Sequence, residues 1–360
     1  MRTVARGENS IFMNNRRVLY FDYLRILATF AVVVIHVVST SWDHADTRTL
    51  EWNVYNLYDG ASRWAVPVFI MISGALFLGR QQSINRLFKA YIRKMCIVFA
   101  FWSTLYALWG YYITCSITTA EIFVRELIVG RYHLWFLPTI IGLYLIVPFL
   151  DKIVEDKKNT FYFLILAFLF SFLIPQCIRI LGFIDEELSQ AFSGLQASAN
   201  IHFMIGYSGY YVLGYALNIT KLSEKQIKVI YIAGICGLVF TIAATAVASI
   251  LMHTPITVYG HFTINTLCVA AAVFTFAKEH FNDYTSVSRE KRLAYLSKSC
   301  FGVYLIHLFV LDILSEFIGL TTQSFNQFLS VPVISLLVYF ISLCLSLALN
   351  KVRFVRQWLM

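Results

Sequence analysis

The chain has 360 residues, of which 59% are hydrophobic and only 14% are charged. Soluble domains contain about 25% charged residues, so this composition excludes an ordinary water-soluble enzyme and predicts an integral membrane protein. The net charge of +9 does not indicate nucleic-acid binding, because the basic residues lie in short clusters between apolar runs and not in one patch.

Ten apolar runs along the chain have about the length that a bilayer-crossing α-helix needs, which is about 20 residues. Helices are the expected structure, because in lipid every backbone polar group must find its partner within the protein. We therefore predict an all-α, polytopic membrane protein with about ten transmembrane helices. They are expected at residues 19–41, 63–79, 95–114, 132–150, 160–176, 202–218, 228–252, 258–277, 300–319 and 331–349.

Lysine and arginine are distributed unevenly between the segments that join these runs. With both termini in the cytoplasm, inner segments hold 23 of the 29 basic residues and outer loops hold five. Cytoplasmic loops are enriched in Lys and Arg, so this split predicts that both termini are cytoplasmic. We expect a multi-pass protein of the inner (plasma) membrane. Its longest connecting segments are expected at residues 42–62 and 177–201 outside and 278–299 inside.

We expect one folded domain with short polar ends. Residues 1–18 are predicted to be a polar cytoplasmic segment, residues 19–350 the ten-helix transmembrane domain, and residues 351–360 a basic cytoplasmic tail. Residues 1–15 are polar, and no small-residue cleavage site follows the first apolar run, so we expect no signal peptide. Met13 is an alternative start of the chain.

The first predicted helix carries Asp22, Arg25 and His36 in an otherwise apolar sequence. A charged side chain at the centre of a membrane helix costs about 2.5 to 3.5 kcal/mol on an insertion scale, so such residues are functional candidates. Arg25 and His36 are eleven residues apart, which is about three turns and about 16 Å along the axis. Asp22 and Thr29 lie on the same side.

This polar stripe predicts that one face of the helix lines a protein cavity. His36 is a candidate general base, because an imidazole can accept a proton near neutral pH. The alternative is structural: Asp22 and Arg25 form an ion pair that anchors the helix, and His36 is hydrogen-bonded inside the bundle.

Three later helices carry the other candidate residues. The second has Pro67 and the pair Ser73-Gly74, which predict a kink or close helix packing. In the fourth helix, the alternative to a binding role is an aromatic belt at the membrane interface. In the ninth helix, the alternative to a binding role is a structural hydrogen-bond network. The candidates for donor or substrate binding are Ser73, Arg63, His133, Trp135, His307, Asp312 and Glu316.

The sequence predicts no metal site and no bound cofactor. No helix shows two histidines at ligand spacing, such as His-x-x-x-His. The seven cysteines have no spacing typical of a zinc or redox motif, so we expect them to be small core residues.

Five segments, taken in order, resemble the acyltransferase-3 membrane family, and together they cover nearly the whole chain. The chain looks most like short members that O-acetylate envelope polysaccharides, such as those that act on the enterobacterial common antigen. One departure is Phe69-Ile70, where the family has two aromatic residues before Ser-Gly, and this leaves the role of Ser73 open. The five segments are Asp22-Tyr23-Leu24-Arg25 with His36, then 66–74, 133–137, Gly206-Tyr207 with Gly214-Tyr215, and 302–307.

The resemblance implies an O-acetyltransferase that takes acetyl-CoA as co-substrate and acetylates a hydroxyl of an envelope polysaccharide or its lipid-linked precursor. It implies that His36 is the essential catalytic residue and that Arg25, next to Asp22, helps to hold the donor. Asp312 or Glu316 is a candidate to orient His36. Basic residues at the inner rim could attract the phosphates of the donor: Arg16, Arg17, Arg86, Lys89, Arg93 and Lys94.

Two alternatives belong to other classes. A transporter or flippase would also have intramembrane charges, although the inverted repeats common in such proteins are missing from this sequence. A membrane module of a protein that handles amino acids is the third hypothesis, and the lack of a fused soluble domain argues against it. The sequence gives neither the sugar nor the oligomeric state.

Overall fold

The computed structural model describes residues 17–198, 206–281 and 286–360. The alternative start at Met13, the rim residue Arg16 and the first residues of the expected helix 202–218 lie outside these ranges. Within them, every regular element is a helix. The all-α prediction is therefore confirmed for the described part of the chain.

Eight helical runs in the described ranges are long and apolar enough to cross a membrane. The expected spans 202–218 and 258–277 correspond to the shorter helices α11 (Tyr207–Ile219) and α13 (Ile264–His280). The chain is thus a polytopic membrane protein, and a total of ten crossings remains a prediction. The eight runs are Leu19–Trp42, Leu50–Phe77, Ile84–Tyr112, Ala120–Val154, Lys157–Leu181, Glu224–Met252, Val287–Phe317 and Gln327–Leu349.

Several of these runs are built from consecutive helices that continue one another. Short π-helical stretches at Leu87–Ile92, Phe168–Leu173 and Ile313–Phe317 join or extend them, and Tyr132–Trp135 is a 3₁₀ turn. The α-helices are α1 (Leu19–Trp42), α2 (Leu50–Ser62), α3 (Ala65–Phe77), α4 (Ile84–Arg86), α5 (Arg93–Tyr112), α6 (Ala120–Val129), α7 (Phe136–Val154), α8 (Lys157–Ala167), α9 (Ile174–Leu181), α10 (Glu186–Ser198), α12 (Glu224–Met252), α14 (Val287–Asp312), α15 (Gln327–Leu349) and α16 (Arg353–Trp358).

The segments that we expected to be connections contain helices, which corrects the sequence analysis. Residues 42–62 include α2, and α14 begins at Val287, within the expected inner segment 278–299. Each of these helices has a capped polar start: the side chains of Thr49 and Ser286 accept hydrogen bonds from backbone N–H groups of the first turn. Hydropathy finds the apolar part of such a helix and misses its polar extension.

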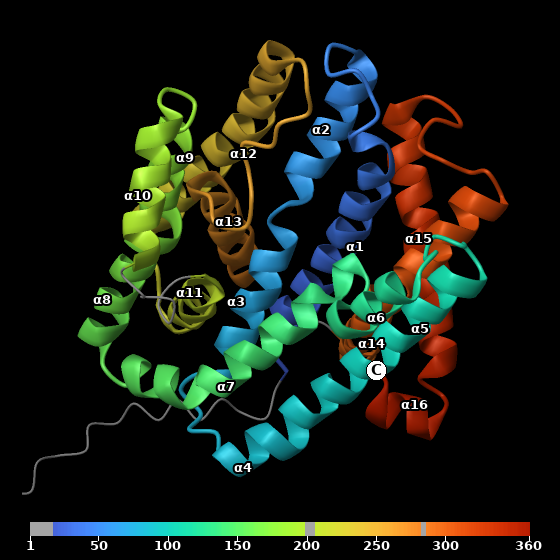
Figure 1. Cartoon of the computed structure of the whole chain (residues 1–360). Coiled ribbons are helices and arrows are strands. Elements are labelled where there is room, and N and C mark those ends of the chain that lie inside the picture. Colours follow the sequence, from blue (N-terminus) through green and yellow to red (C-terminus); the bar gives the residue numbers. More distant parts are fainter. Residues whose placement is uncertain (1–16, 199–205, 282–285) are drawn as a thin grey trace, which may run out of the picture.

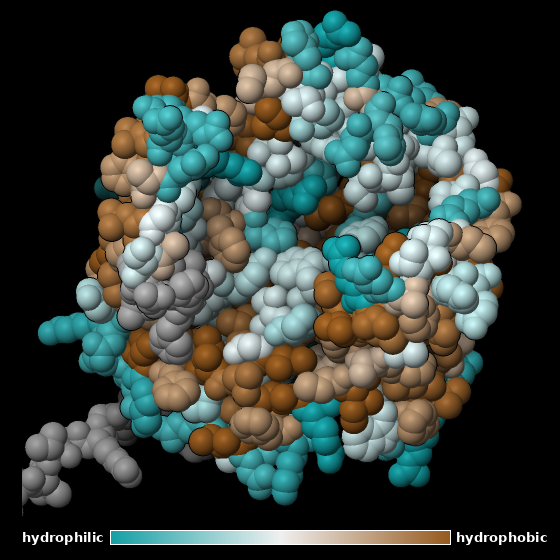
Figure 2. Space-filling model, viewed as in Figure 1, coloured by the Kyte–Doolittle hydropathy of each residue, from teal (hydrophilic) through white to brown (hydrophobic). Residues whose placement is uncertain are grey.

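Helices α1 and α14 lie at the centre of the bundle. In each of them 61% of the most apolar stretch is buried, compared with 17% in α12, which presents apolar side chains outward. Helix α1 contacts α2, α3, α13, α14 and α15 (Figure 1). Hydrophilic residues gather toward the upper and lower edges of Figure 2, and hydrophobic residues spread between them. This distribution suits a protein whose flanks meet lipid.

The second predicted span, 63–79, forms an unbroken helix from Ala65 to Phe77, so the kink expected at Pro67 is absent and the break lies just before it. Helix α2 ends at Ser62 and α3 begins at Ala65, with Pro67 in its first turn, where the missing backbone N–H costs little. Farther along α3, a Cβ on Gly74 would overlap the backbone of Tyr211 in α11, and a Cβ on Gly214 would overlap the backbone of Met71. The two helices therefore pack at backbone contact, which agrees with the close packing expected at Ser73-Gly74.

Candidate active site

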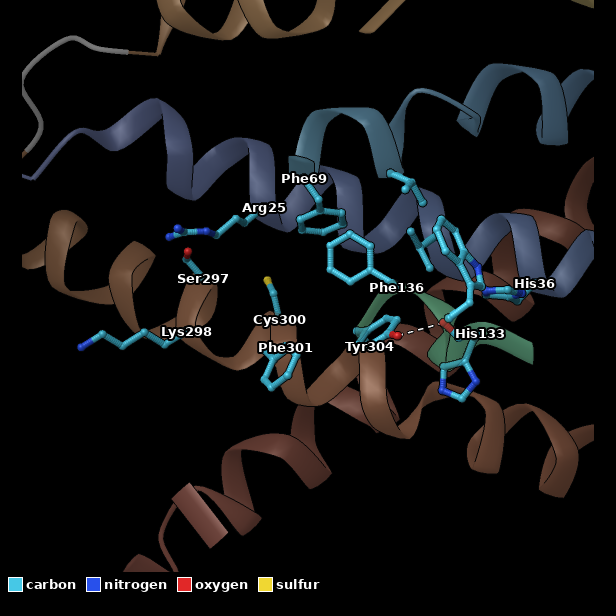
Figure 3. A pocket seen from close by; sticks show the side chains of 13 residues that line it. Arg25, His36, Phe69, His133, Phe136, Ser297, Lys298, Cys300, Phe301 and Tyr304 are labelled. Carbon is cyan, nitrogen blue, oxygen red and sulfur yellow. Dashed lines mark hydrogen bonds between the residues drawn. The ribbon is translucent and has the colours of Figure 1, made fainter. Parts of the chain in front are cut away.

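A cavity of about 310 Å³ lies between α1, α3, α14 and the start of α7. Arg25, Ser297 and Lys298 lie at one end, and His36 and His133 lie at the other (Figure 3). Arg25 and His36 thus face one cavity, as their spacing on α1 predicted. The walls between the two ends are mainly apolar and aromatic, and are formed by Val32, Val66, Phe69, Trp135, Phe136, Cys300, Phe301 and Tyr304.

Asp22 has a different main partner from the one we expected. Its carboxylate accepts two hydrogen bonds from Arg17, at 2.5 and 2.7 Å, whereas the nearest Arg25 nitrogen is 3.7 Å away. This two-bond geometry makes Arg17 the stronger partner. Asp22 is buried and does not line the cavity, while the Arg25 side chain is 31% exposed. The guanidinium of Arg25 is therefore available to a ligand.

Three imidazole rings meet at the end of the cavity opposite Arg25. The ring centroid of His36 lies 5.1 Å from that of His307 and 6.4 Å from that of His133, and the latter two are 5.3 Å apart. Within the described ranges, no group of His, Cys, Asp and Glu is placed to hold a metal ion. Imidazole rings can accept and donate protons near neutral pH, so the cluster offers proton-transfer groups.

The hydrogen bonds of His307 fix its tautomer when the ring is neutral. Its Nδ1 lies 2.7 Å from the carbonyl oxygen of Tyr304, and because a carbonyl only accepts, Nδ1 carries the proton. The Nε2 atom then has a free lone pair, and it has no partner among the described residues. Both ring nitrogens of His133 also lack partners, although this residue is only 2% exposed. Buried polar atoms of this kind call for a functional explanation, such as water or substrate in the cavity.

Trp135 is held by a stack of rings on the side of the cavity away from α14. Its indole stacks on His261 at 5.2 Å and on Tyr207 at 5.7 Å, between ring centroids. The Tyr207 hydroxyl is 2.5 Å from Nδ1 of His261. His261 lies in the loop before α13, where burial and the charge of Arg63 lower its pKa to about 4. The ring is therefore neutral at physiological pH.

Arg63 lies outside the cavity wall, in a charged network of its own. It donates to Asp59 at 2.5 Å, and its guanidinium lies 5.0 Å from the ring centroid of Tyr259. Tyr259 also donates to Asp59. This network joins α2 to the loop before α13, so the structure gives Arg63 a clear packing role.

Ser73 lines a smaller neighbouring cavity of about 170 Å³. This cavity shares Arg25, Phe69, Phe136 and Phe301 with the first one. The Ser73 hydroxyl donates to the carbonyl of Phe69 at 3.0 Å, which is a bond within its own helix. Ser73 is thus close to the Arg25 end of the site and far from the histidines.

Asp312 and Glu316 line a different cavity, on the other side of the histidine cluster. Asp312 accepts a hydrogen bond from Trp109 at 3.2 Å, and Arg131 is 3.7 Å away. In the described structure no hydrogen bond joins either carboxylate to His36. The ring closest to His36 in this cluster is that of His307.

Sequence reasoning missed several residues that line the cavity. Lys298 had a signal, since it ends the basic inner segment just before the predicted ninth helix, but we assigned that segment to topology alone. Some of the basic residues that we did expect at the donor have structural partners: Arg93 lies over the Trp358 ring and Lys94 donates to the carbonyl of Arg356. The other unexpected lining residues are Ser297, Cys300 and Tyr304.

A family model described as an acyltransferase domain, that of the acyltransferase-3 family, matches residues 18–351. No curated protein and no solved structure gives a significant match to the chain. The matched region contains both ends of the cavity and extends over nearly the whole chain. The chain therefore belongs to the acyltransferase-3 family and is a multi-pass membrane acyltransferase.

Proposed function

We propose that this acyltransferase moves an acetyl group from acetyl-CoA to a hydroxyl of a cell-envelope polysaccharide or its lipid-linked precursor, in the inner membrane. The observation that carries the proposal is the cavity that joins the cations Arg25 and Lys298 to His36. The roles of Ser73, Arg63, His133, Trp135 and His307 in donor or acceptor binding remain predictions.

The shape and charge of the cavity suit a CoA thioester. The phosphates of CoA are anionic, and Arg25 and Lys298 provide positive charge at the mouth that we place on the cytoplasmic side. The pantetheine arm is long and narrow, and the apolar walls between Val32 and Tyr304 offer it a path. Arg25 and His36 are about 16 Å apart along α1, so the arm would present its thioester near the histidines.

The reaction follows from the position of His36. The imidazole takes the proton of the acceptor hydroxyl, and the oxygen forms a C–O bond with the thioester carbonyl. The C–S bond then breaks, and the proton passes to the sulfur, which leaves as the CoA thiol. His307, anchored through Nδ1, packs against His36 and restricts its rotation. Asp22 binds Arg17 and thereby fixes the first turn of α1, one turn before Arg25.

Transfer of label from radiolabelled acetyl-CoA by the purified protein in proteoliposomes tests this proposal. We expect His36→Ala to lose at least about 100-fold in rate, the lower end of what a positioned general base contributes. His280→Ala is the matched control, because His280 is exposed at the end of α13 and outside the cavity. Full activity of His36→Ala would reject the proposal. If the activity depends on His36, mass spectrometry of envelope glycans with and without the protein would identify the acetylated sugar.

A further inference from the structure

A second cavity, of about 520 Å³, lies on the opposite side of the histidine cluster from the first. Helices α1 and α14 and the 3₁₀ turn at Tyr132–Trp135 contribute to both. Helix α1 contributes Arg25 to His36 to the first cavity and Ser39 to Ser41 to the second, and α14 contributes in the same order along its length. The second cavity is lined by Ser39, Thr40, Ser41, His44, Arg131, Tyr132, Leu311, Asp312, Ser315, Glu316, Thr321 and Gln323.

A layer of aromatic rings separates the two cavities. Tyr132 lines the second cavity, and its ring centroid is 5.3 Å from that of His36, which lines the first. Tyr132 is 53% exposed, so its ring can turn without leaving a void in the core. It follows Gly130, whose φ of 79° turns the chain at the end of α6. Tyr132 is thus a thin partition between His36 and the second cavity.

The lining of the second cavity suits a polyol. Hydroxyl, amide and carboxylate groups predominate, and these are the groups that donate to and accept from sugar hydroxyls. Arg131 lies 3.7 Å from Asp312, and Glu316 has no ion-pair partner in the described ranges, so the two carboxylates of the lining outnumber its guanidinium. The cavity therefore disfavours an anionic ligand such as a uronate or a phosphosugar.

We propose that the second cavity is the acceptor site, and that it takes a neutral, hydroxyl-rich sugar in preference to an anionic one, with Tyr132 turning aside to admit the hydroxyl to His36. This inference rests on the proposed function and adds the class of acceptor. It also assigns Tyr132 as a positioning residue. The acetyl group crosses from one cavity to the other at the ring layer.

The charge of the acceptor provides the sharpest test. Purified protein in detergent at low salt is given acetyl-CoA with either methyl glucoside or methyl glucuronide, which differ at C6, and kcat/KM is measured for each. We expect the wild type to prefer the neutral glycoside about tenfold or more, since low salt leaves the charge of Glu316 poorly screened. Glu316→Lys should lower that ratio at least about tenfold, whereas Glu121→Lys, an exposed carboxylate on α6 outside the cavity, should not change it.

The outcomes separate this inference from the proposed function. No consumption of acetyl-CoA by the wild type rejects the function itself. Consumption with neither glycoside acetylated, or a selectivity that Glu316→Lys leaves unchanged, overturns the acceptor site and leaves the donor site standing.

Tyr132 gives a second, independent readout. Tyr132→Ala should open the partition, so that acetyl-CoA hydrolysis without an acceptor rises several-fold while transfer to the glycoside falls. Tyr132→Phe keeps the ring and should restore the wild-type ratio of transfer to hydrolysis. Tyr112→Ala is the control, because this tyrosine is 69% exposed at the end of α5 and lines neither cavity. An unchanged ratio in Tyr132→Ala would contradict the assignment.

Discussion

The two cavities are formed largely by the same helices, yet their linings have opposite character. The first has apolar and aromatic walls with cations at one end, and in the second hydroxyl and carboxylate side chains predominate. The change occurs within two turns of α1, between Val32 and Ser39. One helix can therefore serve a thioester arm on one side of the histidines and a polar acceptor on the other.

The hydroxyl groups of α1 can face the second cavity at little cost. Ser39 donates to the carbonyl of His36 at 2.9 Å, and Thr40 donates to that of Val37 at 2.8 Å. Such bonds within the helix satisfy the donors locally and leave the oxygen lone pairs for a ligand. The donors of Ser39 and Thr40 are thus satisfied within α1, while both residues line the second cavity.

The largest expected effect comes from blocking the first cavity without touching its polar groups. Val32 lines it between Arg25 and His36, so Val32→Trp should fill the path of the pantetheine arm and reduce acetyl transfer at least about 100-fold. The measurement is label transfer from radiolabelled acetyl-CoA. If the two cavities serve different substrates, the free acceptor should bind this variant as it binds the wild type.

Leu27→Trp is the matched control for that variant. Leu27 is on the same helix but is 46% exposed and lines neither cavity. Size-exclusion chromatography and thermal stability show whether both variants fold. A folded Val32→Trp with normal transfer would contradict a donor path along α1.

A smaller effect is expected at the cationic mouth. Lys298→Ala should raise the KM for acetyl-CoA about tenfold and leave kcat nearly unchanged, because a phosphate contact there binds the ground state and the transition state equally. Lys291→Ala serves as the control, since Lys291 is exposed on the same helix and outside the cavity. Equal KM values for the two variants would place the phosphates elsewhere.

The sequence was sufficient for the helical architecture and for the face shared by Arg25 and His36. Both follow from local sequence patterns. An apolar run of sufficient length predicts a membrane helix, and two residues eleven positions apart lie on the same face of that helix. The sequence also named His133 and His307 as candidates. Their closeness to His36 depends on how three separate helical segments pack, and no local pattern contains that information.

The residues that were missed or misassigned depend on contacts between elements distant in sequence or just outside a helix. Arg17 was expected to attract donor phosphates and in the structure binds Asp22, because the chain before α1 turns back onto the first turn. For the aromatic residues at the start of the fourth predicted helix we left open an interfacial belt, and the structure places the ring of Tyr132 against His36. Asp312 ends α14 and Glu316 lies in the π-helical stretch that follows, but both line a cavity that hydropathy cannot detect.

The smallest expected effect concerns the ring stack that supports the wall of the first cavity. His261 has a pKa of about 4 in the folded protein, against an ordinary value of 6.5, because it is buried and near Arg63. The unfolded chain therefore binds a proton more tightly, so the contribution of this residue to stability is complete above pH 6.5 and is lost as the pH falls toward 4. The loss should be about 3 kcal/mol at most, at 1.36 kcal/mol per pKa unit. His261→Gln, which cannot take up the proton, should show a flatter dependence of thermal stability on pH in this range.

His253→Asn is the control, because His253 is exposed in the same loop and Asn tolerates its φ of 53°. Parallel pH profiles for His261→Gln and the wild type would show that the stack does not depend on a neutral imidazole, and Trp135 would then owe its position to Tyr207 alone.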